Sequence, residues 1–121
     1  ATIEMNRSGR KHLDAPIIQD VIRLNNCLIE INSKAYKVIS RTYIDPMLKQ
    51  GALLFSYAMR QVRGMDYYKR ATELTYELQF GIYLIVALGG CSKEKASVID
   101  VLCDNILSSL ARIKNVRSEK S

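Results

Sequence analysis

Two runs of apolar residues, joined by a very short connection, constrain the fold of this chain more than any other feature of its sequence. In each run the apolar residues recur at steps of three and four, which places their side chains on one face of an α-helix. The first run consists of Ala71, Leu74, Leu78, Ile82, Ile85 and Leu88, and the second of Ile99, Leu102, Ile106, Leu110 and Ile113. Two such helices with a short joint predict an antiparallel helical hairpin.

Residues typical of helix ends flank both runs. Asp66 can cap the free amides of a first turn, and Gly89, followed by another glycine, can adopt the left-handed backbone angles that end a helix. Ser92 then offers a second cap, while Arg112 and Lys114 complement the helix dipole near the end of the last helix. We therefore expect one helix between Asp66 and Gly89 and another after Ser92.

The first half of the chain carries a second helical pattern. Asp14 and Pro16 mark a helix start, since the missing amide of proline is no loss in a first turn. The apolar seam that follows alternates steps of four and three, as in a helix bundle, through Ile17, Val21, Leu24, Leu28, Ile31, Ala35 and Val38. We expect this helix to end near Arg41, and the Asp-Pro pair at 45–46 to open another helix that ends at Gly64.

The sum of these patterns is four helices with short connections. Only 2 prolines and 6 glycines occur among the 121 residues, which favours helices over sheet. Short connections make neighbouring helices antiparallel, so the prediction is an all-α protein with an antiparallel up-down-up-down four-helix bundle at 14–116. A mobile basic tail at 1–13 and a short polar tail at 117–121 would flank the bundle.

Some helices carry more apolar residues than a four-helix core needs. The additional residues are Ile18, Ile22, Ile29, Ile39, Leu53, Phe80, Tyr83 and Leu84. Excess apolar surface often marks a subunit interface, so we expect a homo-oligomer. The alternative is that the helix faces are assigned one step off and that these residues belong to the core.

The basic residues are concentrated in the middle of the chain. The formal net charge is +6, and the stretch from Lys34 to Arg70 supplies all of it, since the remainder is balanced. The eight basic residues of this stretch are Lys34, Lys37, Arg41, Lys49, Arg60, Arg63, Lys69 and Arg70, and five of the 7 tyrosines lie among them. Basic residues attract phosphates and tyrosines can stack on unpaired bases, so these eight residues are the predicted RNA-binding site. An ordinary solvated face, or a surface for an acidic protein, remains the alternative.

The residues needed for catalysis or metal binding are missing from the pattern. The only histidine, His12, lies in the predicted tail, and no glycine-rich phosphate loop is present. Glu73 and Glu77 are expected to form surface ion pairs with the basic residues one turn earlier. The 3 cysteines have no pairing or zinc spacing. We therefore expect no enzyme, no metal, no cofactor and no membrane span, and a cytoplasmic location.

The second half of the chain resembles a known family of small bundles. The resemblance rests on a basic start at Lys69 and Arg70, the leucine-rich Leu74, Leu78, Leu84 and Ile85, the Ala87-Leu88-Gly89 end, Ser92, and then Leu102, Ile106, Leu110 and Ile113. This pattern is similar to the accessory variability protein of diversity-generating retroelements, and almost equally to the bundle proteins encoded in intervening sequences of large-subunit ribosomal RNA genes. The connection at 42–46 lacks the Phe-Pro and basic loop often found in these families, and Ala96 stands where an aromatic residue is frequent.

The resemblance implies a function as well as a fold. Retroelement accessory proteins form homopentameric barrels that act with a reverse transcriptase and its template RNA in mutagenic cDNA synthesis. By resemblance, this chain would be a noncatalytic homo-oligomer, a pentamer, that binds RNA and a reverse transcriptase. The alternatives are a structural bundle of the ribosomal intervening-sequence type and an adaptor for an acidic protein partner.

Overall fold

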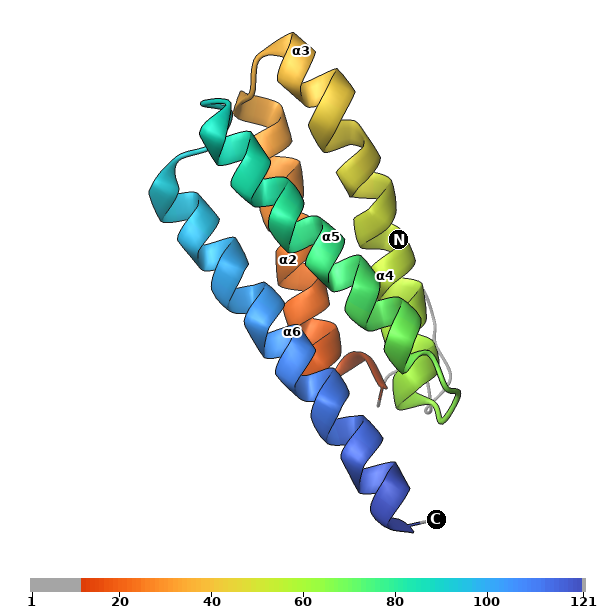
Figure 1. The fold of residues 1–121 in the computed structure, drawn as a ribbon. Helices are drawn as coiled ribbons and strands as arrows, with labels where there is room; N and C mark the ends of the chain where they lie inside the picture. The colour runs from red at the N-terminus through yellow and green to blue at the C-terminus, as the bar shows by residue number, and fades with distance from the viewer. Residues whose placement is uncertain (1–11, 121) are drawn as a thin grey trace.

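The computed structural model describes residues 12–120, with side chains described through residue 117. The predicted basic tail at 1–13 thus lies mostly outside the described residues. Within them the chain is all-α (Figure 1). The elements are α2 (Pro16–Lys34), α3 (Lys37–Ile39), the π-helical turn η1 (Ser40–Ile44), α4 (Asp45–Val62), α5 (Tyr68–Ala87) and α6 (Lys93–Lys120).

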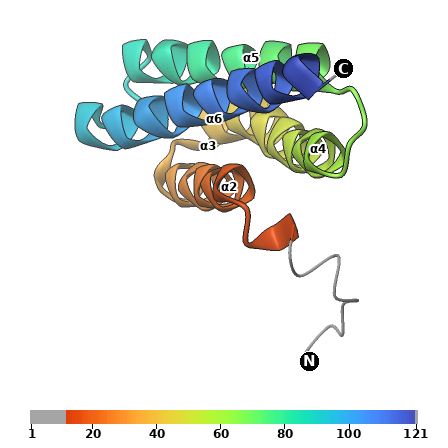
Figure 2. The ribbon, with the colours of Figure 1, turned by 90° about the horizontal axis from the view of Figure 1, so that it is seen from below.

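The four long helices of the described part form an antiparallel bundle. Successive helices alternate in direction, up and down the long axis (Figure 1). Helix α2 packs against α4 and α6, and α5 packs against the same two helices, so α2 and α5 occupy opposite sides of the bundle (Figure 2). The predicted fold class, an up-down-up-down four-helix bundle, is confirmed.

The predicted hairpin supplies much of the core. Of the eleven apolar residues in its two runs, all are buried except Leu88 and Ile113. Leu88 is 46% exposed because α5 ends one residue earlier, so this side chain leaves the buried face. Gly89 adopts a φ of 78° after the helix end, as predicted. The next residue is a glycine for a steric reason, since a Cβ on Gly90 would lie 2.8 Å from the Cγ2 atom of Ile39 in α3.

The first helix is shorter than the sequence predicts. Helix α2 ends at Lys34, and the next residue, Ala35, has an extended backbone, so the predicted end near Arg41 is wrong. The apolar seam continues in sequence but not in the core: Val38 is 72% exposed. Asn32 near the end of α2 holds the turn together, since its side chain accepts a hydrogen bond from Ser40 and donates one to Asp45.

The Asp-Pro pair at 45–46 stands at the start of α4, as predicted, but it does not cap a free helix end, because helical backbone already precedes it. The chain becomes helical again at Lys37 and continues through η1 into α4, so Pro46 lies inside one long helix of 37–62. Proline lacks an amide hydrogen to donate, and its ring collides with the carbonyl four residues back in a regular α-helix. The π-turn just before Pro46 widens the helix there, and the Asp45 amide donates to the Ser40 carbonyl five residues back. The helix therefore passes through the proline instead of starting at it.

Three other helix ends also bear on the predictions. The Asp66 cap is wrong, because the first residue before α5 is Tyr67, whose amide donates instead to the side-chain oxygen of Gln61 at 2.7 Å. The Ser92 cap is confirmed, since the hydroxyl oxygen of Ser92 accepts a hydrogen bond from the Lys95 amide at 3.2 Å. Helix α6 extends to Lys120, so the segment assigned to a polar tail is helical through residue 120.

Candidate nucleic-acid interface

The eight predicted RNA-binding residues are all exposed, but they fall into separate groups. Lys37, Arg41, Lys49 and Arg60 belong to the single long helix formed by α3, η1 and α4. Arg63, Lys69 and Arg70 lie in or beside the connection between α4 and α5. Lys34 stands apart at the end of α2, where its amino group lies 3.5 Å from the Glu30 carboxylate.

The π-turn aligns the basic residues of the long helix. Eight positions separate Arg41 from Lys49, whereas two ordinary helical turns take about 7.2 residues. A π-turn closes its hydrogen bonds five residues back instead of four and so adds about one residue to a turn. With that residue Arg41 falls in line with Lys49, and Lys37 and Arg60 follow at about one and three turns from them. We call Lys37, Arg41, Lys49 and Arg60 the basic ridge.

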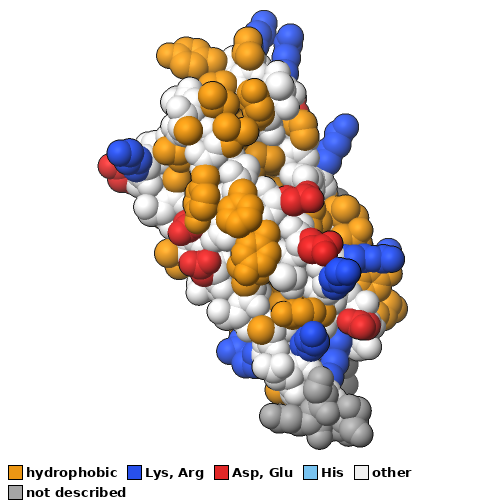
Figure 3. Space-filling view, in the orientation of Figure 1, with side chains coloured by type: hydrophobic (Ala, Val, Ile, Leu, Met, Phe, Trp, Pro, Cys, Tyr) orange, Lys and Arg blue, Asp and Glu red, His pale blue; other side chains and the backbone are white. Residues whose placement is uncertain are grey.

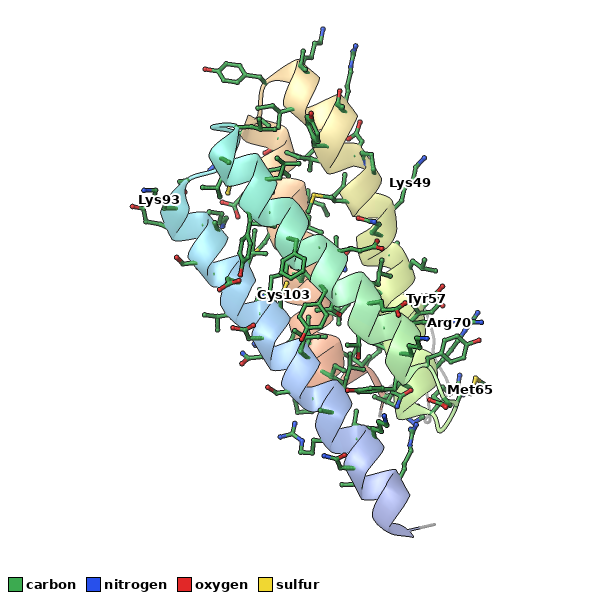
Figure 4. The ribbon with its side chains drawn as sticks, in the orientation of Figure 1. Lys49, Tyr57, Met65, Arg70, Lys93 and Cys103 are labelled. Carbon is green, nitrogen blue, oxygen red and sulfur yellow. The ribbon has the colours of Figure 1, made fainter. Side chains whose placement is uncertain are left out.

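The surface shows the same arrangement. Basic side chains follow the outer edge of α3 and α4 (Figure 3), and Lys49 points away from the bundle on that edge (Figure 4). From Lys37 to Arg60 the ridge spans roughly 35 Å, at about 1.5 Å per helical residue. The ridge thus depends on one continuous helix over 37–62, where the sequence analysis expects two separate helices.

One end of the ridge carries a cluster of arginines and tyrosines. The Arg60 guanidinium lies 5.0 Å from the ring centre of Tyr67 and donates a 2.8 Å hydrogen bond to its hydroxyl. The Arg70 guanidinium lies 5.4 Å from the centre of the same ring, and the Tyr57 ring lies 5.4 Å from it. Figure 4 shows Tyr57, Arg70 and Met65 at this end of the bundle. Two cations and two aromatic rings are therefore already assembled, with exposed arginine surfaces.

Helix α6 adds basic residues that the sequence analysis missed. The Lys114 amino group lies 4.3 Å from the ring centre of Tyr68, and Arg117 donates hydrogen bonds to the carbonyls of Gln61 and Met65. An antiparallel bundle places the end of its last helix beside the connection between its second and third helices, so the topology itself was the available signal. We call Arg60, Arg63, Lys69, Arg70, Lys114 and Arg117, with their tyrosines, the basic end cluster.

The outer face of α5 and its border with α6 have the opposite charge. Tyr76, Phe80 and Tyr83 form an exposed row, with ring centres 5.7 and 5.9 Å apart. Glu73 and Glu77 belong to α5, and Asp100 and Asp104 of α6 border it through hydrogen bonds with Gln79 and Tyr83. Acidic side chains lie on both sides of the exposed apolar row in Figure 3. We call the three aromatic and four acidic residues the acidic aromatic face. Such a face repels nucleic acid.

Neutral side chains hold most of these carboxylates in place. The buried Gln79 amide donates to Asp100 and to Asp104, both at 2.9 Å, and Gln50 of α4 donates to Glu77 at 2.9 Å. Tyr83 donates a 2.5 Å hydrogen bond to Asp100, which raises the pKa of Tyr83 to about 12. The expected ion pairs of Glu73 and Glu77 with the preceding basic residues do not form among residues 12–117.

A cleft at the far end of the bundle holds one partly buried thiol and an ion pair. Its volume is about 720 Å³, and its lining includes Cys91, Glu30 and Lys95. Burial raises the pKa of Cys91, so its thiol is protonated and a weak nucleophile. The Lys95 amino group lies 2.5 Å from Glu30, and this hydrogen bond lowers the pKa of the carboxyl and raises that of the amine.

The described residues form neither a metal-binding group nor a membrane-spanning helix. No three histidine, cysteine or acidic side chains of residues 12–117 are placed to hold a metal ion together. None of the described helices is both long and apolar enough to cross a membrane. Comparison of the chain with protein-family models, with curated protein sequences and with solved structures gives no match. What the structure itself shows is a four-helix all-α protein with separate basic and acidic surfaces.

Proposed function

We propose that this protein is a noncatalytic RNA-binding accessory protein that acts with a reverse transcriptase in the mutagenic cDNA synthesis of a diversity-generating retroelement. The observation that carries the RNA-binding part is the pair Arg60 and Arg70 over the ring of Tyr67, with Tyr57 stacked beside it. The association with a reverse transcriptase and the assembly into a homo-oligomer, a pentamer, are proposed from the family resemblance of the sequence.

The chemistry of the basic end cluster supports RNA as the ligand. Single-stranded RNA combines phosphates, which arginine binds in a fork geometry, with unstacked bases, which lie on aromatic faces or on guanidinium planes. The protein groups that bind them, two guanidinium groups and a second aromatic ring, lie 5.0 to 5.4 Å from the ring centre of Tyr67. In addition, ion pairs among residues 12–117 involve none of Arg60, Arg63 and Arg70, so their charge is available to a polyanion.

The basic ridge extends the same surface along the helix. A strand bound at the cluster meets further lysines and arginines in the direction of Lys49 and Arg41, roughly one per two turns. Binding through several phosphates releases counterions, so affinity falls as salt rises, with a slope of about −0.7 per phosphate on a single strand. A structural bundle of the ribosomal intervening-sequence type without an RNA ligand predicts no such dependence.

The test is a binding titration with a structured RNA that contains single-stranded loops, at several salt concentrations. We expect Arg60→Glu combined with Arg63→Glu to abolish binding while helix content is unchanged, because both side chains are exposed. The matched control is Arg23→Glu combined with Lys93→Glu, which makes the same change in net charge away from the cluster. Arg23 lies on α2, and Figure 4 shows Lys93 at the opposite end of the bundle from Arg70.

The outcomes separate the alternatives. Normal affinity of the Arg60→Glu/Arg63→Glu variant, or equal loss in the control, would remove RNA from the basic end cluster. If an acidic polypeptide displaces the bound RNA but unrelated RNA does not, the result would favour the adaptor for an acidic protein. Light-scattering mass of the protein with and without RNA reports the stoichiometry in the same samples.

A further inference from the structure

The acidic aromatic face is an apolar surface that the single chain leaves in water. Tyr76 is 43% exposed, Phe80 57% and Tyr83 49%. Leu84, one turn after Phe80 on α5, is 48% exposed. A large aromatic side chain has roughly 200 Å² of surface, so about half of three such side chains already gives roughly 300 Å² of exposed aromatic area. The largest exposed apolar patch of a monomeric protein is commonly of this size and is often functional.

The charge around the aromatic row defines the partner. Glu73, Glu77, Asp100 and Asp104 surround it, and the hydrogen bonds that hold three of them come from amides and a hydroxyl, which do not neutralise them. In residues 12–117 no lysine or arginine forms an ion pair with these four carboxylates. A two-fold contact of this face with itself would set the carboxylates of two copies against each other. The face therefore fits a positively charged surface that also offers apolar side chains.

The same chain has such a surface on α3 and α4. Lys37, Arg41 and Lys49 line the ridge, and Val38 and Leu53 beside them are 72% and 43% exposed. Asp45, which lies in the same segment, is hydrogen-bonded to Asn32 on α2. Within one molecule the two faces lie on neighbouring helices and border each other, since Gln50 of α4 donates to Glu77 of α5. In two molecules the faces can be set against each other, and the charges and apolar groups of one complement those of the other.

We infer that copies of this chain associate head to tail, with the acidic aromatic face of one copy on the Lys37–Leu53 segment of the long helix in the next. Each copy then uses two different surfaces, and repetition of this contact gives a ring or a filament according to the angle between neighbours. This inference specifies the contact behind the homo-oligomer of the proposed function. In the assembly the next copy covers the ridge from Lys37 to Lys49, so RNA contacts along the ridge are open only to a chain without that neighbour, whereas the basic end cluster, beyond Leu53, stays free for RNA.

Single-face variants test the contact in the absence of RNA. Phe80→Asp disrupts the acidic aromatic face, and Lys49→Glu combined with Leu53→Asp disrupts the ridge. Because every head-to-tail contact needs one face of each kind, each variant alone is expected to be a monomer of 13.7 kDa. In an equimolar mixture the intact ridge of the first variant meets the intact face of the second, so we expect heterodimers of twice that mass and nothing larger.

Two further variants test whether charge contributes to the contact and whether any exposed apolar residue would have the same effect. Glu73→Lys combined with Glu77→Lys keeps every apolar side chain and should also give monomers, whereas Ile29→Asp on α2, at 57% exposure as in Phe80, should assemble like the wild type. Light scattering and circular dichroism report mass and folding together. A monomeric wild type would overturn the inference, and so would assembly of either single-face variant alone. RNA binding by the basic end cluster is measured separately and can succeed or fail independently.

Discussion

Gly51 lies where α4 crosses α2, and replacing it with alanine should destabilise the bundle although alanine is the better helix former. A Cβ at this position would lie 2.4 Å from the side-chain oxygen of Asn25 and 3.3 Å from Leu28 Cδ1. Asn25 is not free to move away without loss, because its amide donates to the Val21 carbonyl at 2.9 Å and to the Gly51 carbonyl at 3.1 Å. Gly51→Ala must therefore displace a side chain that joins the two helices.

The balance of effects gives a sign as well as a size. Overpacking of a core costs about 1–3 kcal/mol, and the lost interhelical hydrogen bond adds about 1 kcal/mol. Alanine in a helix interior returns about 1 kcal/mol relative to glycine. The free energy of unfolding should thus fall by about 1–3 kcal/mol, whereas helix propensity alone predicts a rise.

Urea unfolding followed by circular dichroism measures this difference, and the chain offers a matched control. A Cβ on Gly81, in the middle of α5, would approach only the flexible end of Met47, at 3.1 Å from Cε. Gly81→Ala should be neutral or stabilising by up to about 1 kcal/mol. In an Asn25→Ala background Gly51→Ala should also become stabilising, because the obstructing side chain is gone. Stabilisation by Gly51→Ala in the wild-type background would refute the steric account.

Two predictions concern titration and reactivity. The hydrogen bond to Asp100 raises the pKa of Tyr83 to about 12, so its contribution to stability is complete below the ordinary tyrosine pKa of 10.0 and is lost as the pH rises through about 12. Ultraviolet absorbance should show one late-ionising tyrosine in the folded protein, and Tyr83→Phe should remove it; its persistence would assign it elsewhere. Burial raises the pKa of the Cys103 thiol to about 12, so a thiol reagent should modify Cys91 in the folded protein and Cys103 only on unfolding. Equal rates of modification at Cys91 and Cys103 would contradict that burial.

The sequence predicts the fold well where a single helix face carries the information. The spacing of Leu74, Leu78, Ile82 and Ile85 identifies a helix and its buried side without reference to the rest of the chain. The same rule fails at Val38, because the apolar spacing continues across a turn that Asn32 and Ser40 stabilise through side-chain contacts between two helices. The spacing of apolar residues along one helix does not predict side-chain contacts between two helices.

The candidate site was predicted in part for a similar reason. The charge count identifies Arg60 and Arg70, and the structure brings both to the ring of Tyr67. Lys114 and Arg117 were missed because they are more than forty positions away in sequence and join the cluster only through the packing of α6. Glu73 and Glu77 were assigned to ion pairs by their distance along the helix, but Glu77 instead contacts Gln50 of the neighbouring helix.

The π-turn at Ser40–Ile44 also affects how insertions and deletions would be read in this chain. Deleting one residue between Arg41 and Asp45 would restore a regular helix, with the core contacts of α4 retained, and would leave Arg41 seven positions, about two turns, before Lys49, so the ridge would stay in line. A protein of the same architecture that lacks the π-turn would need its basic residues one position closer to the equivalent of Lys49 to form the same ridge. An alignment of two such sequences without a one-residue gap in the π-turn would then show mismatched lysines where the surfaces are in fact the same.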